Sequence, residues 1–227
     1  MLLLIIGILL LTVCQQKEEP STLNISAAAS LQDVLEELKT IYIQRHPSVA
    51  IQYNFGSAGS LQQQIEQGAA ADIFISASPK HMEALIFEDL VLTDTKVNLL
   101  KNKIVLIVPK DNSIINSFED LGDSNVSKVG IGDPGSTPLG VYGTEIMNYY
   151  GIFDAVQEKL VFAKDVREVL SWVETQNADA GFVFETDAKV GKNVQIAAIA
   201  PEESHKPVVY PAAILKNNEN KEGAEVF

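Results

Sequence analysis

Ala27-Ala28-Ala29-Ser30 joins an apolar, β-like run to a helical pattern. The same kind of joint recurs at Phe55-Gly56-Ser57-Ala58-Gly59, Pro134-Gly135-Ser136-Thr137-Pro138-Leu139 and Lys164-Asp165-Val166. Each joint leaves backbone N–H groups free at the positive end of a helix dipole, which holds an anion without any charged side chain. Four such joints in one chain predict that they point at one ligand.

Strand and helix patterns alternate along the first part of the chain. Strands are predicted at 23–28, 49–55 and 73–75, and apolar residues recur at helical spacing after 31, 61 and 79. The alternation predicts an α/β fold with largely parallel sheets.

A second series of the same kind follows. Strands are predicted at 104–108, 129–131, 160–162, 181–184, 194–199 and 208–215, with helices at 139–150 and 166–176. Two series predict two lobes, with the chain crossing between them near 103–106 and returning near 196–208. A ligand would then bind in the cleft between the lobes, where the helix starts converge.

The composition describes an acidic protein with enough apolar residues for a sizeable core. Of 227 residues 46% are hydrophobic, and the formal net charge is −13. This charge argues against a nucleic-acid partner and against binding to a membrane through basic residues. An anionic ligand would approach through an unfavourable long-range field, so its capture would depend on local dipoles.

The N-terminus has the apolar run of a signal peptide, too short for an ordinary membrane span of about 20 residues. Leu11-Thr12-Val13-Cys14 is similar to a bacterial lipobox, in which the cysteine carries lipid. Val13 replaces the usual small residue, and no Lys or Arg precedes the run. The alternative is a plain signal peptide with an incidental cysteine. Since Cys14 is the only cysteine, disulfides are excluded.

No arrangement of residues predicts catalysis or a bound metal cation. His46, His81 and His205 are scattered, and no metalloprotease, serine-hydrolase or P-loop motif occurs. Asp72 and Asp133 follow predicted strands without a second carboxylate at useful spacing, so we interpret them as turn caps. We therefore expect no enzyme activity and no cofactor.

The helix starts carry residues that are typical of N-caps, and each alone fits an ordinary structural cap. Together they also fit a binding site, because every one of them follows a predicted strand. The predicted caps are Ser30 with Asp33 in a capping box, Ser57 with Ser60, Thr137 before Pro138, and Asp165 with Glu168 in a second box.

Several of these motifs together resemble the molybdate-binding protein of ABC importers. The resemblance runs in order from about residue 23 to 227. It implies a two-lobed type II periplasmic-binding-protein fold that closes on a tetrahedral oxyanion, molybdate or tungstate. It is carried by Ala27-Ala28-Ala29-Ser30-Leu31, Phe55-Gly56-Ser57-Ala58-Gly59-Ser60-Leu61, the segment 64–77, Gly132-Asp133-Pro134, Asp165-Val166-Arg167 and Pro201-Glu202-Glu203-Ser204-His205.

The resemblance also implies the ligand contacts. They fall on the Ser30 hydroxyl, Ala58 with its neighbour Ser57, the N–H groups of Leu139 and Val166, and Phe184. Two positions depart from the family pattern. Ala58 stands where serine is frequent, and Phe184 replaces a tyrosine and so lacks a hydroxyl.

The implied protein is a monomeric, extracytoplasmic substrate-binding protein. It would deliver its oxyanion to an ABC permease and ATPase, held on the outer face of the cytoplasmic membrane by a lipid anchor, or it would be periplasmic. We expect an anchor and tether at 1–22, lobe 1 at 23–103 plus 203–227, and lobe 2 at 104–202. We also expect a truncated C-terminus. Alternatives are a carrier for sulfate or another oxyanion, and an oxyanion sensor.

Overall fold

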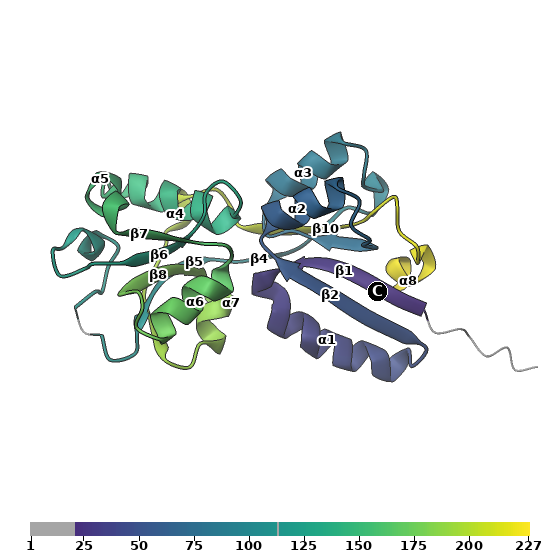
Figure 1. Ribbon diagram of the computed structural model, residues 1–227, viewed down its shortest axis with the longest axis horizontal. Coiled ribbons are helices and arrows are strands. Elements are labelled where there is room, and N and C mark those ends of the chain that lie inside the picture. The colour runs from purple at the N-terminus through teal and green to yellow at the C-terminus, as the bar shows by residue number, and fades with distance from the viewer. Residues whose placement is uncertain (1–20, 113) are drawn as a thin grey trace, which may run out of the picture.

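The structure, a computed structural model, describes residues 21–112 and 114–227 and has two lobes (Figure 1). The predicted leader and Cys14 lie outside these residues. The first lobe is built on a five-stranded sheet. Its strands, in spatial order, are β2 (Val49–Gly56), β1 (Ser21–Ala28), β3 (Ile73–Ile75), β10 (Val209–Ile214) and β4 (Val97–Lys101).

The second lobe is built on another five-stranded sheet. Its strands, in spatial order, are β7 (Leu160–Ala163), β6 (Val129–Gly132), β8 (Ala180–Phe184), β5 (Ile104–Pro109) and β9 (Val194–Ile199). The chain passes from one sheet to the other between β4 and β5 and returns between β9 and β10. The residue limits predicted for the lobes remain a proposal.

Helices pack against each sheet. The first lobe carries α1 (Gln32–Arg45), α2 (Ala58–Glu66), α3 (Pro79–Phe87) and α8 (Lys221–Val226). The second carries α4 (Pro138–Tyr149), α5 (Phe153–Val156), α6 (Val166–Glu174) and α7 (Glu185–Val190). Short 3₁₀ helices are η1 (Ala29–Leu31), η2 (Thr93–Thr95), η3 (Glu119–Gly122), η4 (Gln157–Lys159) and η5 (Glu202–Ser204). In the described chain, no helix combines the length and apolar character that a membrane crossing requires.

The α/β class is confirmed, but the prediction of largely parallel sheets is wrong. β1 pairs in parallel with β2 and β3, and β6 with β7 and β8. By contrast, β10 is antiparallel to β3 and β4, and β5 is antiparallel to β8 and β9. β5 and β10 are the strands that the chain enters from the other lobe. Because no helical crossover precedes them, the parallel direction that such a crossover imposes does not apply.

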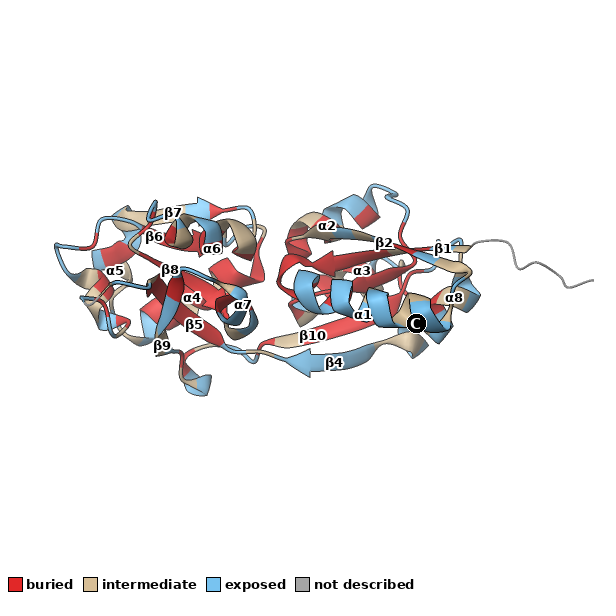
Figure 2. Cartoon of the chain, turned by 90° about the horizontal axis from the view of Figure 1, so that it is seen from below, coloured by how far each residue is buried: buried red, intermediate tan, exposed pale blue. Residues whose placement is uncertain are grey.

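The core of each lobe lies along the central strands (Figure 2). The side chains of Ile104 to Val108 are all fully buried, which explains their uninterrupted apolar sequence. The helix α1 differs from its predicted pattern. Leu35 is buried, but Val34 and Ile41 are 53% and 44% exposed, so the apolar stripe is wider than the face that meets the sheet.

Candidate functional site

The four predicted joints converge on one small cavity between the lobes. Its volume is about 20 Å³, where a single buried water needs about 10–15 Å³. No Lys, Arg or His is among the lining residues. They are Ala28, Ala29, Ser30, Gly56, Ser57, Ala58, Ala77, Thr137, Pro138, Leu139, Asp165, Val166 and Phe184.

Ser30 lines the cavity, but the prediction that it caps α1 is wrong. A 3₁₀ turn, η1, precedes the helix, and Ser30 lies inside that turn with Ala28 at its N-cap. The Ser30 hydroxyl instead lies 2.9 Å from the hydroxyl of Tyr210 on β10. Asp33 forms no capping box, because its carboxylate pairs with Arg167 of the other lobe.

The α2 joint presents a hydroxyl and a helix start to the cavity. Ser57 is the N-cap of α2, and its Oγ accepts the Ser60 N–H at 3.2 Å and lies 2.8 Å from the Ser60 hydroxyl. Ala58 is the first helical residue and is buried, and N–H groups of a first helical turn have no intrahelical acceptor. Both residues line the cavity, as the sequence predicted for a site.

The α4 joint follows the predicted cap with a proline at the first helical position. Thr137 Oγ1 accepts the Gly140 N–H at 3.0 Å and donates its one proton to the Asp133 carbonyl at 2.9 Å, so it has no proton left for a ligand. Pro138 fixes the first helical residue and has no N–H. The next residue, Leu139, lines the cavity, and its N–H is the first that the helix offers there.

The α6 joint is also capped as predicted. Asp165 Oδ1 accepts the Glu168 N–H at 3.1 Å, and Glu168 in turn accepts the Lys164 N–H at 2.8 Å. Val166 opens the helix at the cavity. Helix α6 packs closely on β8, because Gly181 has no side chain there: a Cβ at Gly181 would lie 2.7 Å from the side chain of Val169 on α6. This close packing fixes the start of the helix at the cavity. Asp165 is the one carboxylate in the lining, and its charge faces the positive end of its own helix.

Phe184 ends β8, is 3% exposed and lines the cavity. Its ring packs edge-on against Tyr210, with ring centroids 5.9 Å apart. The ring therefore closes one side of the cavity with an apolar wall and contributes no donor.

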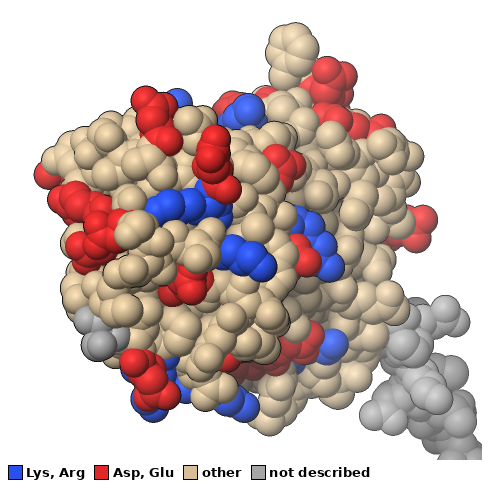
Figure 3. Space-filling model, turned by 60° about the vertical axis from the view of Figure 1, so that its left-hand side comes forward, with Lys and Arg blue, Asp and Glu red and all other residues tan. Residues whose placement is uncertain are grey.

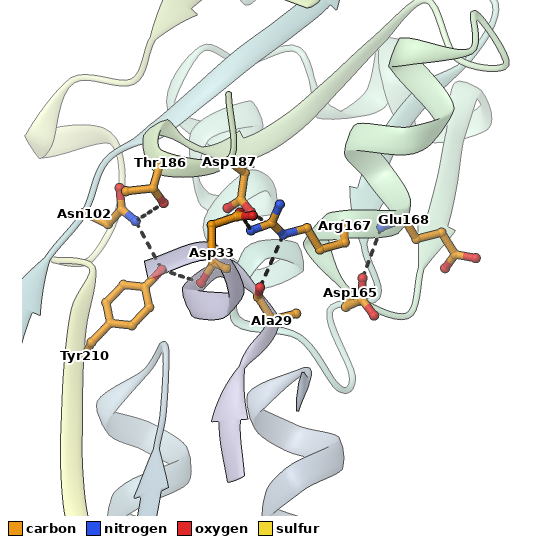
Figure 4. Close-up of polar contacts among 10 residues, drawn as sticks. Ala29, Asp33, Asn102, Asp165, Arg167, Glu168, Thr186, Asp187 and Tyr210 are labelled. Atoms are coloured by element: carbon orange, nitrogen blue, oxygen red, sulfur yellow. Dashed lines mark hydrogen bonds and ion pairs between the residues drawn. The ribbon is translucent and has the colours of Figure 1, made fainter. Parts of the chain in front are cut away.

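Two sets of contacts close the lobes on the cavity. The Gly59 N–H on α2 donates to the Ser136 carbonyl of the second lobe at 3.1 Å. Arg167 on α6 reaches the other way: its Nε–H donates to the Ala29 carbonyl at 3.3 Å, and its guanidinium pairs with Asp33 (Figure 4).

Asp187 on α7 is a fully buried carboxylate beside Arg167. Its Oδ1 lies 3.0 Å from Arg167 Nε, but neither oxygen accepts a hydrogen bond from the part of the chain that the structure describes. Burial raises the pKa of Asp187 to about 7, although the Arg167 charge acts in the opposite direction. The group therefore titrates near neutral pH.

The histidines and the two turn-capping aspartates, for which the sequence predicts no role in binding or catalysis, are not among the residues that line the cavity. His46 stacks on Tyr42, and His81 Nδ1 lies 2.7 Å from Gln62 Oε1. Asp72 caps a turn, accepting N–H groups from Asn24, Glu219 and Asn220. Within residues 21–112 and 114–227, no group of three His, Cys, Asp or Glu could hold a metal ion.

Sequence reasoning missed Tyr210 and the role of Arg167. Tyr210 lies 180 residues from Ser30, so only the fold brings them together. Arg167 was part of a quoted motif without an assigned role. Its place directly after Val166 at a helix start is the signal that could have identified it as a residue near the cleft.

Two lobes joined by two crossings, with a cavity where parallel strands meet helix starts, define the two-lobed type II periplasmic-binding-protein fold. The sequence profile of the bacterial extracellular solute-binding proteins matches residues 23–227. The chain therefore belongs to that family.

Relatives and solved structures agree with this assignment. A Bacillus subtilis protein provisionally named ABC transporter substrate-binding lipoprotein YvgL is 44% identical over 92% of this chain and 80% of its own length. The molybdate-binding protein ModA of Haemophilus influenzae is 36% identical over 89% of this chain and 81% of its own. The periplasmic molybdate-binding protein of Azotobacter vinelandii superposes with a TM-score of 0.81 at 26% identity, covering 90% of each chain.

Proposed function

We propose that this chain is the extracytoplasmic substrate-binding protein of an ABC importer, that its ligand is molybdate or tungstate, and that it has no enzyme activity. The observation that carries the proposal is the small cavity lined by helix starts and hydroxyls, with no cationic side chain. Names of relatives support it, since ModA proteins are named for binding molybdate.

The proposed ligand contacts come from both lobes. The Ser30 and Ser57 hydroxyls and the Ala58 N–H would bind from the first lobe, and the Leu139 and Val166 N–H groups from the second. Phe184 would line the site without donating a hydrogen bond to the ligand. N–H and O–H donors suit a fully deprotonated dianion, which offers acceptors in every direction.

Titration of the purified protein with molybdate, tungstate, sulfate and phosphate tests the ligand. We expect molybdate and tungstate to raise the unfolding free energy, by about 2.7 kcal/mol at one hundred times Kd. Sulfate is smaller and would leave the donors at longer distance, so its binding should be weaker. Tighter binding of sulfate or phosphate, or no binding by any of the four, would show that the proposed ligand is wrong.

The anchor is a separate proposal. Cys14 would carry lipid and hold the chain on the outer face of the cytoplasmic membrane, with 15–20 as a polar tether before β1 begins at Ser21. One relative is named a lipoprotein, which supports this placement. Cys14→Ser should release the protein from membranes or leave its leader uncleaved. Wild-type protein that fractionates as soluble, with no lipid mass on its N-terminus, would refute the anchor.

The acidic surface is compatible with a ligand captured by local dipoles. On the face drawn in Figure 3, Lys and Arg side chains are interspersed with Asp and Glu. We propose permease and ATPase subunits as the protein partners and a monomeric binding protein. An oxyanion sensor would bind the same ligands, and import of molybdate by cells that carry or lack the gene separates the two roles.

A further inference from the structure

Tyr210 is a fully buried tyrosine whose hydroxyl lies behind the cavity, not in its lining. Its Oη is 2.9 Å from Ser30 Oγ and 3.2 Å from Asn102 Nδ2. Figure 4 shows Tyr210 and Asn102 reaching toward each other, with Thr186 of α7 on the far side of the amide. The directions of these hydrogen bonds decide where the Ser30 proton points.

The orientation of the Asn102 amide is fixed by its neighbour. The Lys103 N–H donates to Asn102 Oδ1 at 2.9 Å, so the amide nitrogen faces away from Lys103. An amide NH₂ donates two hydrogen bonds and accepts none. Asn102 Nδ2 therefore donates to Tyr210 Oη and, at 3.0 Å, to Thr186 Oγ1.

The Tyr210 hydroxyl keeps its proton, because burial raises its pKa further above the ordinary value of 10. That proton needs an acceptor, since a buried O–H without one costs about 1–3 kcal/mol. Within the described chain, the hydrogen-bond partners of Tyr210 Oη are Asn102 and Ser30. Because Asn102 is a donor, Tyr210 donates to Ser30.

We propose that Tyr210 and Asn102 are positioning residues that orient the Ser30 hydroxyl as a donor into the anion cavity. Ser30 Oγ accepts from Tyr210, so its own proton is not spent on the protein and is aimed at the ligand. Donors linked in series also polarise one another and strengthen the last bond. The inference rests on the proposed function and deepens it, because it names how one donor is prepared for an oxyanion.

The series of donors is tied to both lobes. Ser30 and Tyr210 belong to the first lobe, Asn102 lies in the link between β4 and β5, and Thr186 belongs to the second lobe. The Asn102 amide is therefore held by contacts on both sides of the link, to Lys103 and Thr186 on one side and to Tyr210 on the other.

A double-mutant cycle tests the proposal. Molybdate, or whichever oxyanion of the panel the wild type binds most tightly, is titrated calorimetrically into wild type, Tyr210→Phe, Ser30→Ala and the double variant. Tyr210→Phe should weaken binding about 3- to 10-fold, as expected for one hydrogen bond. In the Ser30→Ala background the same change should cost less than about 2-fold, since Tyr210 acts only through Ser30.

Tyr53→Phe is the matched control. Its hydroxyl donates to the Leu35 carbonyl at 2.8 Å in the same lobe, so its loss removes one tyrosine hydrogen bond away from the cavity and should leave Kd unchanged. Asn102→Ala removes the first side-chain donor and should repeat the pattern of Tyr210→Phe, which covers the case that Tyr210→Phe does not fold.

The outcomes separate the two proposals. A wild type that binds no oxyanion refutes the proposed function, and the inference falls with it. A wild type that binds, with equal losses for Tyr210→Phe in both Ser30 backgrounds or no loss in either, refutes the inference alone. A merely structural role for Tyr210 predicts those equal losses, because it does not pass through the Ser30 hydroxyl.

Discussion

Gly59 gives the sharpest test that this structure is the closed, ligand-binding arrangement. A Cβ added at Gly59 would lie 2.4 Å from the Ser136 carbonyl oxygen of the other lobe, where ordinary contact begins at 3.4 Å. The backbone carbonyl cannot turn aside, unlike the His81 ring at 3.2 Å. Gly59→Ala therefore forces the lobes apart by about 1 Å at the rim of the cavity.

Gly59→Ala should weaken the binding of the ligand and should not destabilise the first lobe. Separation lengthens the 3.1 Å hydrogen bond from Gly59 to Ser136 and draws the Ala58 N–H away from the second-lobe donors. One neutral hydrogen bond of about 0.5–1.5 kcal/mol and one to a charged ligand of about 1.5–3 kcal/mol give a loss of about 2–4.5 kcal/mol. That is roughly 30- to 1,600-fold in Kd. The substitution should stabilise helix α2 itself, since alanine is favoured over glycine in helices by up to about 1 kcal/mol.

Calorimetry with molybdate measures the loss, and thermal unfolding without ligand measures the fold. Gly122→Ala is the matched control, because a Cβ there meets its nearest atom, on Ala155 of the same lobe, only at 3.8 Å. We expect weakened binding in Gly59→Ala alone, with ligand-free stability kept. Unchanged affinity in Gly59→Ala would refute the reasoning, since the ligand would then bind without this closure.

Three further changes probe the same site. Ser30→Ala should weaken oxyanion binding about ten- to a hundredfold and cost stability through the lost Tyr210 bond; calorimetry that finds equal affinity removes Ser30 from the site. Phe184→Tyr should tighten molybdate binding by no more than about 1.5–3 kcal/mol, less if an ordered water already donates there; equal or weaker binding would argue that the ring position does not meet the ligand. The pKa of Asp187 is about 7 in the folded protein and near 3.8 in the unfolded chain, so the folded protein binds this proton more tightly. The free energy of unfolding should therefore fall by up to about 4 kcal/mol as the pH rises from 4 to 7. Denaturant titrations should lose that slope in Asp187→Asn, and an unchanged slope would contradict the assignment.

Local chemistry explains what the sequence alone predicted. The caps at Thr137 and Asp165 were predicted correctly because each is completed by an N–H three residues further on. The four joints were predicted because strand and helix periodicities change abruptly there. The prediction that these joints meet rested on two ideas: the carboxyl ends of parallel strands lie at one edge of a sheet, and a two-lobed chain places two such edges across a cleft.

Long-range contacts explain what could not be predicted. The sequence around Ser30 is typical of an N-cap, but its hydroxyl lies against the Tyr210 hydroxyl and caps no helix, and no local pattern signals that partner. The strand β4 was missed because its residues are all exposed, which leaves no alternation to detect. The antiparallel directions of β5 and β10 follow from the two lobe crossings, which local periodicity does not encode.

An acidic protein can hold a dianion because the two electrostatic effects act over different distances. The net charge of −13 is spread over the surface, and at physiological salt its field is screened beyond about 8 Å. Each helix N-terminus carries the equivalent of about +0.5 charge at its first turn, within contact distance of the ligand. Four such ends supply about +2, and the Asp165 carboxylate in the lining sets about −1 against the α6 end, so the lining offsets part of a dianion's charge without a cationic side chain. Since two of the four ends belong to each lobe, all four act on the ligand together only when the lobes are closed, so the ligand's own charge favours closure.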